Sequence, residues 1–203
     1  MKHRALSVVF LLSLLVLVLA SLPVNAHADI ITFVGDLGPI DPGPQFVEGN
    51  FRYDVLSGEL FRDSDGNPGP DMEGSSTGGG GVLRVVRNDV PGGLFTFDAS
   101  DIRFEFAQAA QITFAGYLNG MLQATDVFTT TSDSTWLTVN SLNLAGIKID
   151  ELDVTLNATI STASDIDNLV LSPVAGTVPE PSSLLLLGTG VAGLGVVRRR
   201  FVK

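Results

Sequence analysis

The chain has 203 residues, enough for one domain with additional segments at its ends. It contains no cysteine, so disulfides and thiolate metal sites are excluded. Its formal net charge of −10 argues against a nucleic-acid partner, because phosphate binding needs Lys and Arg.

The first segment, residues 1–28, has the features of a secretory signal peptide. A positively charged start precedes a long apolar stretch, which we expect to form a signal helix. Ala26 and Ala28 then form the small-x-small pattern of a cleavage site. We therefore expect cleavage between Ala28 and Asp29, with an uncleaved membrane anchor as the alternative.

Residues 29–171 show the period-two alternation that is typical of half-buried β-strands. In "ELDVTL", Leu152, Val154 and Leu156 alternate with polar residues, and residues 102–106 and 111–118 do the same. Further strands are expected at these segments: 31–35, 51–55, 82–87, 94–98, 134–140 and 167–171. Frequent turn signals separate them, including residues 39–44, 66–70 and 91–93.

Asn119 and Gly120 lie between two such segments and predict a hairpin with a type I′ turn. No window of this region has a convincing helical period. We therefore predict an all-β fold, a jelly-roll-like β-sandwich, as the passenger domain over residues 29–171.

The passenger is strongly acidic, with 21 Asp and Glu against 6 Lys and Arg between residues 29 and 177. Its densest acidic stretch is "DSDGNPGPD", where Asp63, Asp65, Asn67 and Asp71 alternate oxygen ligands as in the front half of a calcium-binding loop. The stretch lacks the usual glycine at position 6 and the usual glutamate at position 12. Two interpretations stay open, a Ca²⁺ site and a solvated acidic turn between strands.

Catalytic residues are scarce in the passenger. Both histidines lie in the N-terminal segment, so Ser-His-Asp, Cys-His and His-ligated zinc sites are excluded after cleavage. We predict no catalytic residue and no required cofactor, calcium apart. A secreted glycosidase that uses two carboxylates remains an alternative, because composition does not exclude it.

Trp136 is the one tryptophan of the chain and the candidate ligand residue. If Leu137 and Val139 face the core, Trp136 faces outward and is able to stack on a sugar ring. The alternative is that it packs against a neighbouring strand or loop.

The C-terminal part divides into a linker with a Pro-Glu-Pro motif, residues 172–181, and an apolar segment with a basic end, residues 182–203. Its uncharged run of residues 184–197 would span about 21 Å as a helix, against about 30 Å of bilayer hydrocarbon. We expect a short transmembrane helix, with a buried hairpin as the alternative. Positive charges at both ends of the chain place both ends on the cytoplasmic side during export and the acidic segment outside.

This tail resembles the PEP-CTERM protein-sorting tail in the order and spacing of its three parts. The resemblance assigns two sets of residues, the recognition motif and the basic charges that stop the helix: Pro179, Glu180 and Pro181; Arg198, Arg199 and Arg200. The layout of the passenger strands is similar to the jelly-roll passengers of such proteins. The resemblance implies Gram-negative bacteria that make extracellular polysaccharide.

The resemblance also implies partners and a location. The partners are an exosortase, the export machinery and, during sorting, the membrane, followed by release to the cell surface or the extracellular matrix. We therefore expect a non-enzymatic structural or adhesive protein. The alternative activity is calcium-dependent binding of exopolysaccharide through the acidic stretch and Trp136.

Overall fold

The computed structural model describes residues 27–67, 69–74, 80–105, 110–130, 135–157 and 163–174. All of them belong to the compact unit Ala26–Val174. The signal segment with Ala26, the Pro-Glu-Pro motif, the apolar tail and its arginines lie outside the described residues. Within the described residues, no helix has the length and apolarity to span a membrane.

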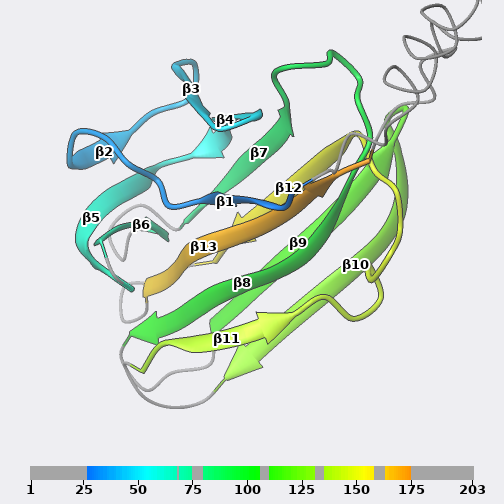
Figure 1. The fold of residues 1–203 in the computed structure, drawn as a ribbon. Coiled ribbons are helices and arrows are strands. Elements are labelled where there is room, and N and C mark those ends of the chain that lie inside the picture. The colour runs from blue at the N-terminus through cyan, green and yellow to red at the C-terminus, as the bar shows by residue number, and fades with distance from the viewer. Residues whose placement is uncertain are drawn as a thin grey trace, which may run out of the picture. The chain divides into compact units, whose positions relative to one another are not determined.

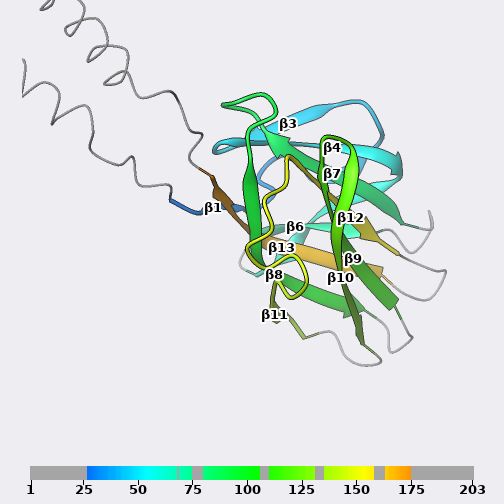
Figure 2. The same cartoon turned by 90° about the vertical axis from the view of Figure 1, so that its right-hand side faces the viewer.

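The described residues form thirteen strands in two antiparallel sheets, which Figures 1 and 2 show as two layers. The first sheet has the order β11-β8-β13-β6-β5-β2, and β1 pairs with β13 beside this path. Its strands are β1 (Asp29–Ile31), β2 (Gly38–Ile40), β5 (Leu60–Gly66), β6 (Gly69–Gly74), β8 (Phe95–Glu105), β11 (Leu137–Asn140) and β13 (Ala163–Pro173).

The second sheet has the order β10-β9-β12-β7-β4-β3. Its strands are β3 (Gln45–Glu48), β4 (Phe51–Gly58), β7 (Gly81–Arg87), β9 (Ala110–Leu118), β10 (Met121–Thr130) and β12 (Glu151–Leu156). In Figure 1, β13 and β8 of the first sheet lie in front of β12 and β9 of the second. The all-β sandwich expected from the alternating pattern is thereby confirmed.

The core fills the space between the inner faces of the two sheets. In β12, Leu152, Val154 and Leu156 are fully buried, as their alternation predicts. Phe97 of β8 stacks on Phe114 of β9 with ring centroids 4.6 Å apart and planes 14° apart, which joins the two sheets. Each such side chain contributes about 1.5–3 kcal/mol through burial alone, so these contacts hold the layers together.

A β-bulge in β13 decides which of its side chains face outward. Asn168 has φ +47°, and the register with β8 shifts between Asp167 and Val170. Ile166 lies in the core before the bulge, and Leu169 lies in the core after it. The bulge thus moves the core-facing positions from even to odd residue numbers, which leaves Asp165 and Asp167 on the outer face.

Several local predictions are confirmed. The segments 51–55, 82–87 and 111–118 lie in β4, β7 and β9. Asn119 and Gly120 have φ values of +52° and +73°, the two positive values that a type I′ turn requires.

Other boundaries differ from the expected ones. Residues 94–98 and 102–106 were expected as two strands, but β8 is continuous from Phe95 to Glu105 because Ala99, Ser100 and Asp101 pair with β11. The strand expected at 31–35 is β1 and ends at Ile31, since Phe33 adopts φ +55°. Of the expected segment 134–140, residues 137–140 form β11 and residues 135 and 136 precede it without strand structure.

The passenger also extends beyond its expected end. β13 continues to Pro173, two residues into the segment expected as a linker. The amide of Val174 donates to the carbonyl of Leu94 at 2.8 Å, so backbone bonding to the β8 side persists through residue 174. At the other end, β1 begins at Asp29, the residue that cleavage after Ala28 would expose.

Candidate ligand-binding face around Arg103 and Trp136

The topology brings the acidic stretch, Trp136 and two distant strands to one face of the first sheet. Asp165 of β13 is in register with Arg103 of β8 on one side and with Glu73 of β6 on the other. Directly paired residues of antiparallel strands project from the same face. We call Asp65, Asp71, Arg103, Asp165 and Trp136 on this outer face the Arg103 cluster.

Arg103 is the centre of this cluster. Its Nε donates to Asp165 Oδ2 at 2.7 Å, and its Nη1 and Nη2 donate to the two oxygens of Asp65 at 2.8 and 3.0 Å. Nη2 also lies 3.5 Å from Asp71 Oδ2. Paired, bidentate hydrogen bonds of this kind are the strongest that an arginine makes with carboxylates.

Three residues of the cluster are buried although it lies on the outer face of the sheet, whereas Asp65 is exposed and Trp136 is half-buried. Arg103 is 7% exposed, and Asp71 and Asp165 are fully buried. The Arg103 Cζ lies 4.8 Å from the centre of the Trp136 ring, so the indole covers the guanidinium. A buried charge is tolerated only when it is paired, which explains why the one guanidinium gathers several carboxylates.

Two of these carboxyl groups favour the protonated form. Burial raises the pKa of Asp165 to about 8, although the hydrogen bond from Arg103 opposes the shift. Burial, followed by the charge of Asp65, raises the pKa of Asp71 to about 7. Within the described part of the chain, neither oxygen of Asp71 has a hydrogen-bond partner. The hydrogen bond from Arg103 lowers the pKa of Asp65, which is therefore ionised at neutral pH.

The tip of the β5–β6 hairpin is fixed to the neighbouring strands by amide hydrogen bonds. The amide of Asn67 donates to Asp167 Oδ2 at 2.7 Å, and its side chain donates to Asp101 Oδ2 at 3.4 Å. Asn168, at the bulge, donates to Asp101 Oδ2 at 2.9 Å and to the Asn67 carbonyl. The bulge therefore positions the hairpin over β13.

The four residues predicted as calcium ligands lie in one hairpin but have different surroundings. Asp63 is exposed and is opposite Asp71 in the β5–β6 register. Asp65 and Asp71 face Arg103, whereas Asn67 bonds to Asp101 and Asp167. Among the described residues, no group of three or more acidic, His or Cys side chains has the arrangement of a metal site. Calcium binding stays a prediction, and it would require Ca²⁺ to compete with Arg103.

Trp136 is half-buried, directly before β11. Its Nε1 donates to the Asp65 carbonyl at 3.4 Å, and one part of its ring contacts Arg103. Val139 is in the core, whereas Leu137 is 59% exposed because it lies on the edge strand β11. Trp136 therefore packs against the β5–β6 hairpin and Arg103, and its role as a ligand residue stays a prediction.

Sequence reasoning missed Arg103 and Asp165, the two central residues of the cluster. The alternation of residues 102–106 predicts only that Arg103 points away from the apolar side chains of its strand. The available signal was that arginines are few and carboxylates are many in this domain, so that each arginine has many possible ion-pair partners. The partner at position 165 is 62 residues away and could not be chosen without the strand order.

The fold and the cluster define the class of protein: an acidic antiparallel β-sandwich with a buried ion cluster on one outer face. Residues 177–200, which follow the sandwich directly, match the PEP-CTERM protein-sorting motif. The chain therefore carries a sorting motif behind a β-sandwich passenger, and the motif implies export and exosortase-mediated surface attachment.

The sandwich is similar to solved carbohydrate-binding modules at low sequence identity. A CBM29-2 variant complexed with mannohexaose is 12% identical with a TM-score of 0.41, covering 74% of this chain and 93% of that chain. CBM29_1 from Piromyces equi is 7% identical with a TM-score of 0.43, covering 76% and 95%. A family 11 module of a Clostridium thermocellum cellulase is 18% identical with a TM-score of 0.33, covering 74% and 96%. A comparison with curated proteins gives no match.

Proposed function

We propose that this protein is a surface or matrix protein that exosortase sorts through its C-terminal motif, with the sandwich as a non-catalytic structural or adhesive module. The observation that carries the proposal is the position of the motif. The sandwich ends at Val174, and the matched motif begins at residue 177. Two prolines fix φ and remove amide donors, so Pro179-Glu180-Pro181 is suited to recognition as an extended segment.

Replacing Pro179, Glu180 and Pro181 with alanine in the full chain tests the sorting step. We expect the natural chain in the surface fraction in a shortened form and the variant in the membrane fraction at full length. Replacing Ser182 and Ser183 with alanine is the matched control and should leave processing unchanged. Equal processing and location of the triple-alanine variant and the natural chain would contradict the proposal.

A non-catalytic role for the passenger is supported by the way its acids are used. Glycoside hydrolysis requires two carboxyl groups that reach the substrate on either side of the scissile bond. Asp71 and Asp165 have the raised pKa values of a general acid, but both are fully buried. Asp65 gives both of its oxygens to Arg103. The cluster is thus better suited to holding the sheet and hairpin together than to catalysis.

Calcium-dependent carbohydrate binding at the Arg103 cluster is a second candidate. It is favoured by Asp71, which belongs to the same cluster as Asp65 and Trp136. The two oxygens of Asp71 are buried and have no hydrogen-bond partner among the described residues. Titration of the protein with Ca²⁺ in a calorimeter, followed by a glycan array with and without Ca²⁺, tests this candidate. It requires saturable binding that Asp71→Asn abolishes and that the exposed control Asp41→Asn retains. A flat titration would end it.

A further inference from the structure

A pocket of about 340 Å³ lies on the outer face of the second sheet, away from the Arg103 cluster. Its wall combines strand residues with the turns that follow β7 and β9: Arg52, Val86, Arg87, Asn88, Pro91, Gly92, Gly120, Asp150 and Glu151. The volume is at the lower end of the range of small-ligand sites, sufficient for a small polar ligand. No residue of the Arg103 cluster lines this pocket.

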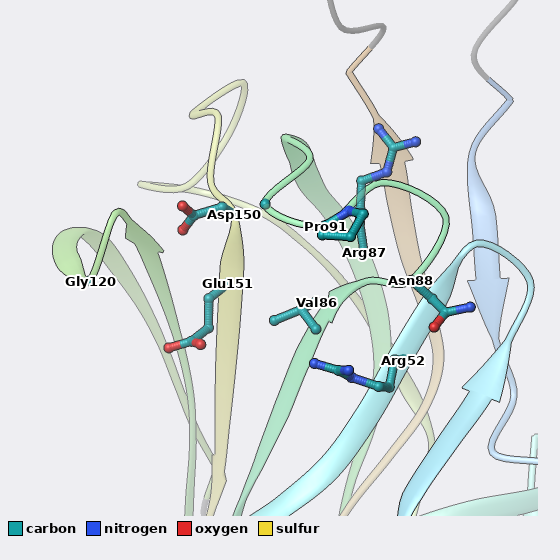
Figure 3. Close-up of a pocket in the computed structure, with 9 residues that line it drawn as sticks. Arg52, Val86, Arg87, Asn88, Pro91, Gly120, Asp150 and Glu151 are labelled. Atoms are coloured by element: carbon teal, nitrogen blue, oxygen red, sulfur yellow. The ribbon is translucent and has the colours of Figure 1, made fainter.

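The floor of the pocket is one row of side chains across three strands. Arg52 of β4 is in register with Val86 of β7, and Val86 is in register with Glu151 of β12. Their chain neighbours Tyr53, Val85 and Leu152 are in the core, so this row faces outward. With strands about 4.8 Å apart, the α-carbons of Arg52 and Glu151 lie about 10 Å apart with an apolar residue between them. Figure 3 shows Val86 between the two charged side chains.

Tyr117 of β9 continues the same row, because it is in register with Glu151. An aromatic side chain, an acid, an apolar residue and a guanidinium therefore follow one another across the sheet. A ligand that is longer than the pocket and lies across the strands would therefore contact all four side chains.

Arg52 is the residue that indicates the ligand. The other four arginines of the described segments are each engaged by hydrogen bonds or ion pairs: Arg62, Arg84, Arg87 and Arg103. Arg52 alone among them has no hydrogen-bond or ion-pair partner within the described segments, and its Nε is buried without a partner. In a domain with 21 acids, an arginine that none of them engages is available to an anion from outside.

Glu151, on the other side of Val86, is an acidic side chain that also has no such partner among the described residues. Its carboxylate makes no hydrogen bond or ion pair with the described residues, whereas Asp150 beside it accepts from the Asn119 amide at 2.9 Å. A free carboxylate accepts hydrogen bonds from hydroxyl groups. A ligand that fits both sides must carry an anionic group at one end and hydroxyl groups at the other, with C–H surface against Val86 and Pro91.

We propose that this pocket binds a uronic-acid unit of an extracellular polysaccharide, with its carboxylate on Arg52 and its hydroxyls on Glu151. The guanidinium fork matches a carboxylate with two parallel hydrogen bonds. The proposal rests on the proposed surface location, which exposes the sandwich to polysaccharide. It adds the ligand class and the residues that recognise it.

Calorimetric titration of the full-length protein with hexagalacturonate tests the site. We expect saturable binding, and we expect Arg52→Gln to weaken it by about tenfold or more, the loss typical of a charged hydrogen bond. Arg52→Lys keeps the charge but not the fork, so an intermediate loss is expected. Lys148→Gln removes one positive charge from an exposed position outside the pocket and should bind as the natural chain does. Circular dichroism and thermal melting establish that each variant is folded.

Three comparison ligands separate the possible outcomes. A hexasaccharide with its carboxylates reduced to alcohols should bind at least about tenfold more weakly, because the Arg52 contact is lost. Monomeric galacturonate distinguishes a single-unit site from one that needs the polymer, and either result supports the proposal. Inorganic phosphate that competes as well as hexagalacturonate would overturn it, since it would show an anion site without sugar recognition.

Equal affinity of Arg52→Gln and the natural chain would also overturn the proposal, as would the absence of uronate binding. These results leave the proposed surface location untouched, because cell fractionation reports on location independently. Conversely, a protein that binds hexagalacturonate through Arg52 but stays in the cytosol would contradict the proposed function while the site stands.

Discussion

The Nε of Arg103 and Oδ2 of Asp165 lie 2.7 Å apart across the β8–β13 pair, both from side chains that are nearly or fully buried. This contact joins two strands that are far apart in the sequence and anchors the remaining carboxylates of the cluster. Its removal would leave buried carboxyl groups without the guanidinium that faces them, and that consequence can be measured.

Arg103→Met should destabilise the protein severely. Truncating one partner of a buried ion pair costs about 3–5 kcal/mol. Here the change also leaves the buried Asp165 without its hydrogen-bond donor. Urea unfolding followed by fluorescence of Trp136 measures the loss. Lys148→Met, at an exposed position, should change the unfolding free energy by less than about 0.5 kcal/mol. A loss below about 1 kcal/mol for Arg103→Met would show that the cluster is not a structural centre.

Protonation of Asp153 should make the folded protein more stable when the pH is lowered mildly. Burial, followed by the charge of Glu151, raises the pKa of Asp153 to about 6 against the opposing effect of Arg84. Asp54 also faces this group, from β4 through Arg84. The folded state therefore binds a proton at Asp153 more tightly than the unfolded state does. The resulting contribution to the free energy of unfolding is fully present below about pH 4 and is lost as the pH rises through about 6.

Asp153→Asn isolates this contribution. Denaturant midpoints between pH 4 and pH 8 should fall less steeply with rising pH in Asp153→Asn than in the natural chain. Asp41→Asn, at an exposed position, is the control and should keep the natural slope. Parallel curves for Asp153→Asn and the natural chain would contradict the assignment.

Phe97 and Phe114 should be strongly coupled, since their stacked rings join the two sheets. Each single change to alanine should cost about 3–5 kcal/mol, because both side chains are almost completely buried. A double-mutant cycle should give a coupling energy of about 0.5–1.5 kcal/mol. Leu137→Ala, at an exposed residue, is the control for loss of apolar surface. Strict additivity of the two phenylalanine changes would show that the rings do not interact.

Two glycines with nearly the same φ should respond very differently to alanine. Gly120, at φ +73°, has open space where a Cβ would lie, so Gly120→Ala carries only the backbone cost of about 1–2 kcal/mol. At Gly58, with φ +77°, the Cβ would lie 2.1 Å from the Gly80 carbonyl oxygen. Gly58→Ala should therefore lower the melting temperature several times more than Gly120→Ala. Similar shifts would mean that the β4–β7 edge relaxes freely.

The sequence predicts the sandwich well where one strand face is apolar and the other polar, as in β12 and β9. It fails for β5 and β6, because Asp63 and Asp65 carry the acidic and turn-forming character of a loop although both lie in β5 and Asp63 pairs with Asp71. The candidate site shows the same limit. Asp65, Asp71 and Trp136 stand out in the sequence, but their meeting at Arg103 depends on a strand order that local patterns do not contain. That Arg52 has no hydrogen-bond or ion-pair partner within the described segments likewise depends on how the strands assemble.

The pairing of Asp29 with Leu171 places the first and last strands of the sandwich side by side, so that its two chain ends lie at the same end of the fold. A tether attached after Val174 would therefore hold the domain by one pole. β13 leads from Asp165 back to that pole over nine residues, about 30 Å of extended chain. Arg87 in the pocket wall contacts the Val174 carbonyl at 3.2 Å, so the pocket belongs to the tethered pole. The Arg103 cluster would then be carried at the far pole, and a polymer held in the pocket would run close to the point of attachment.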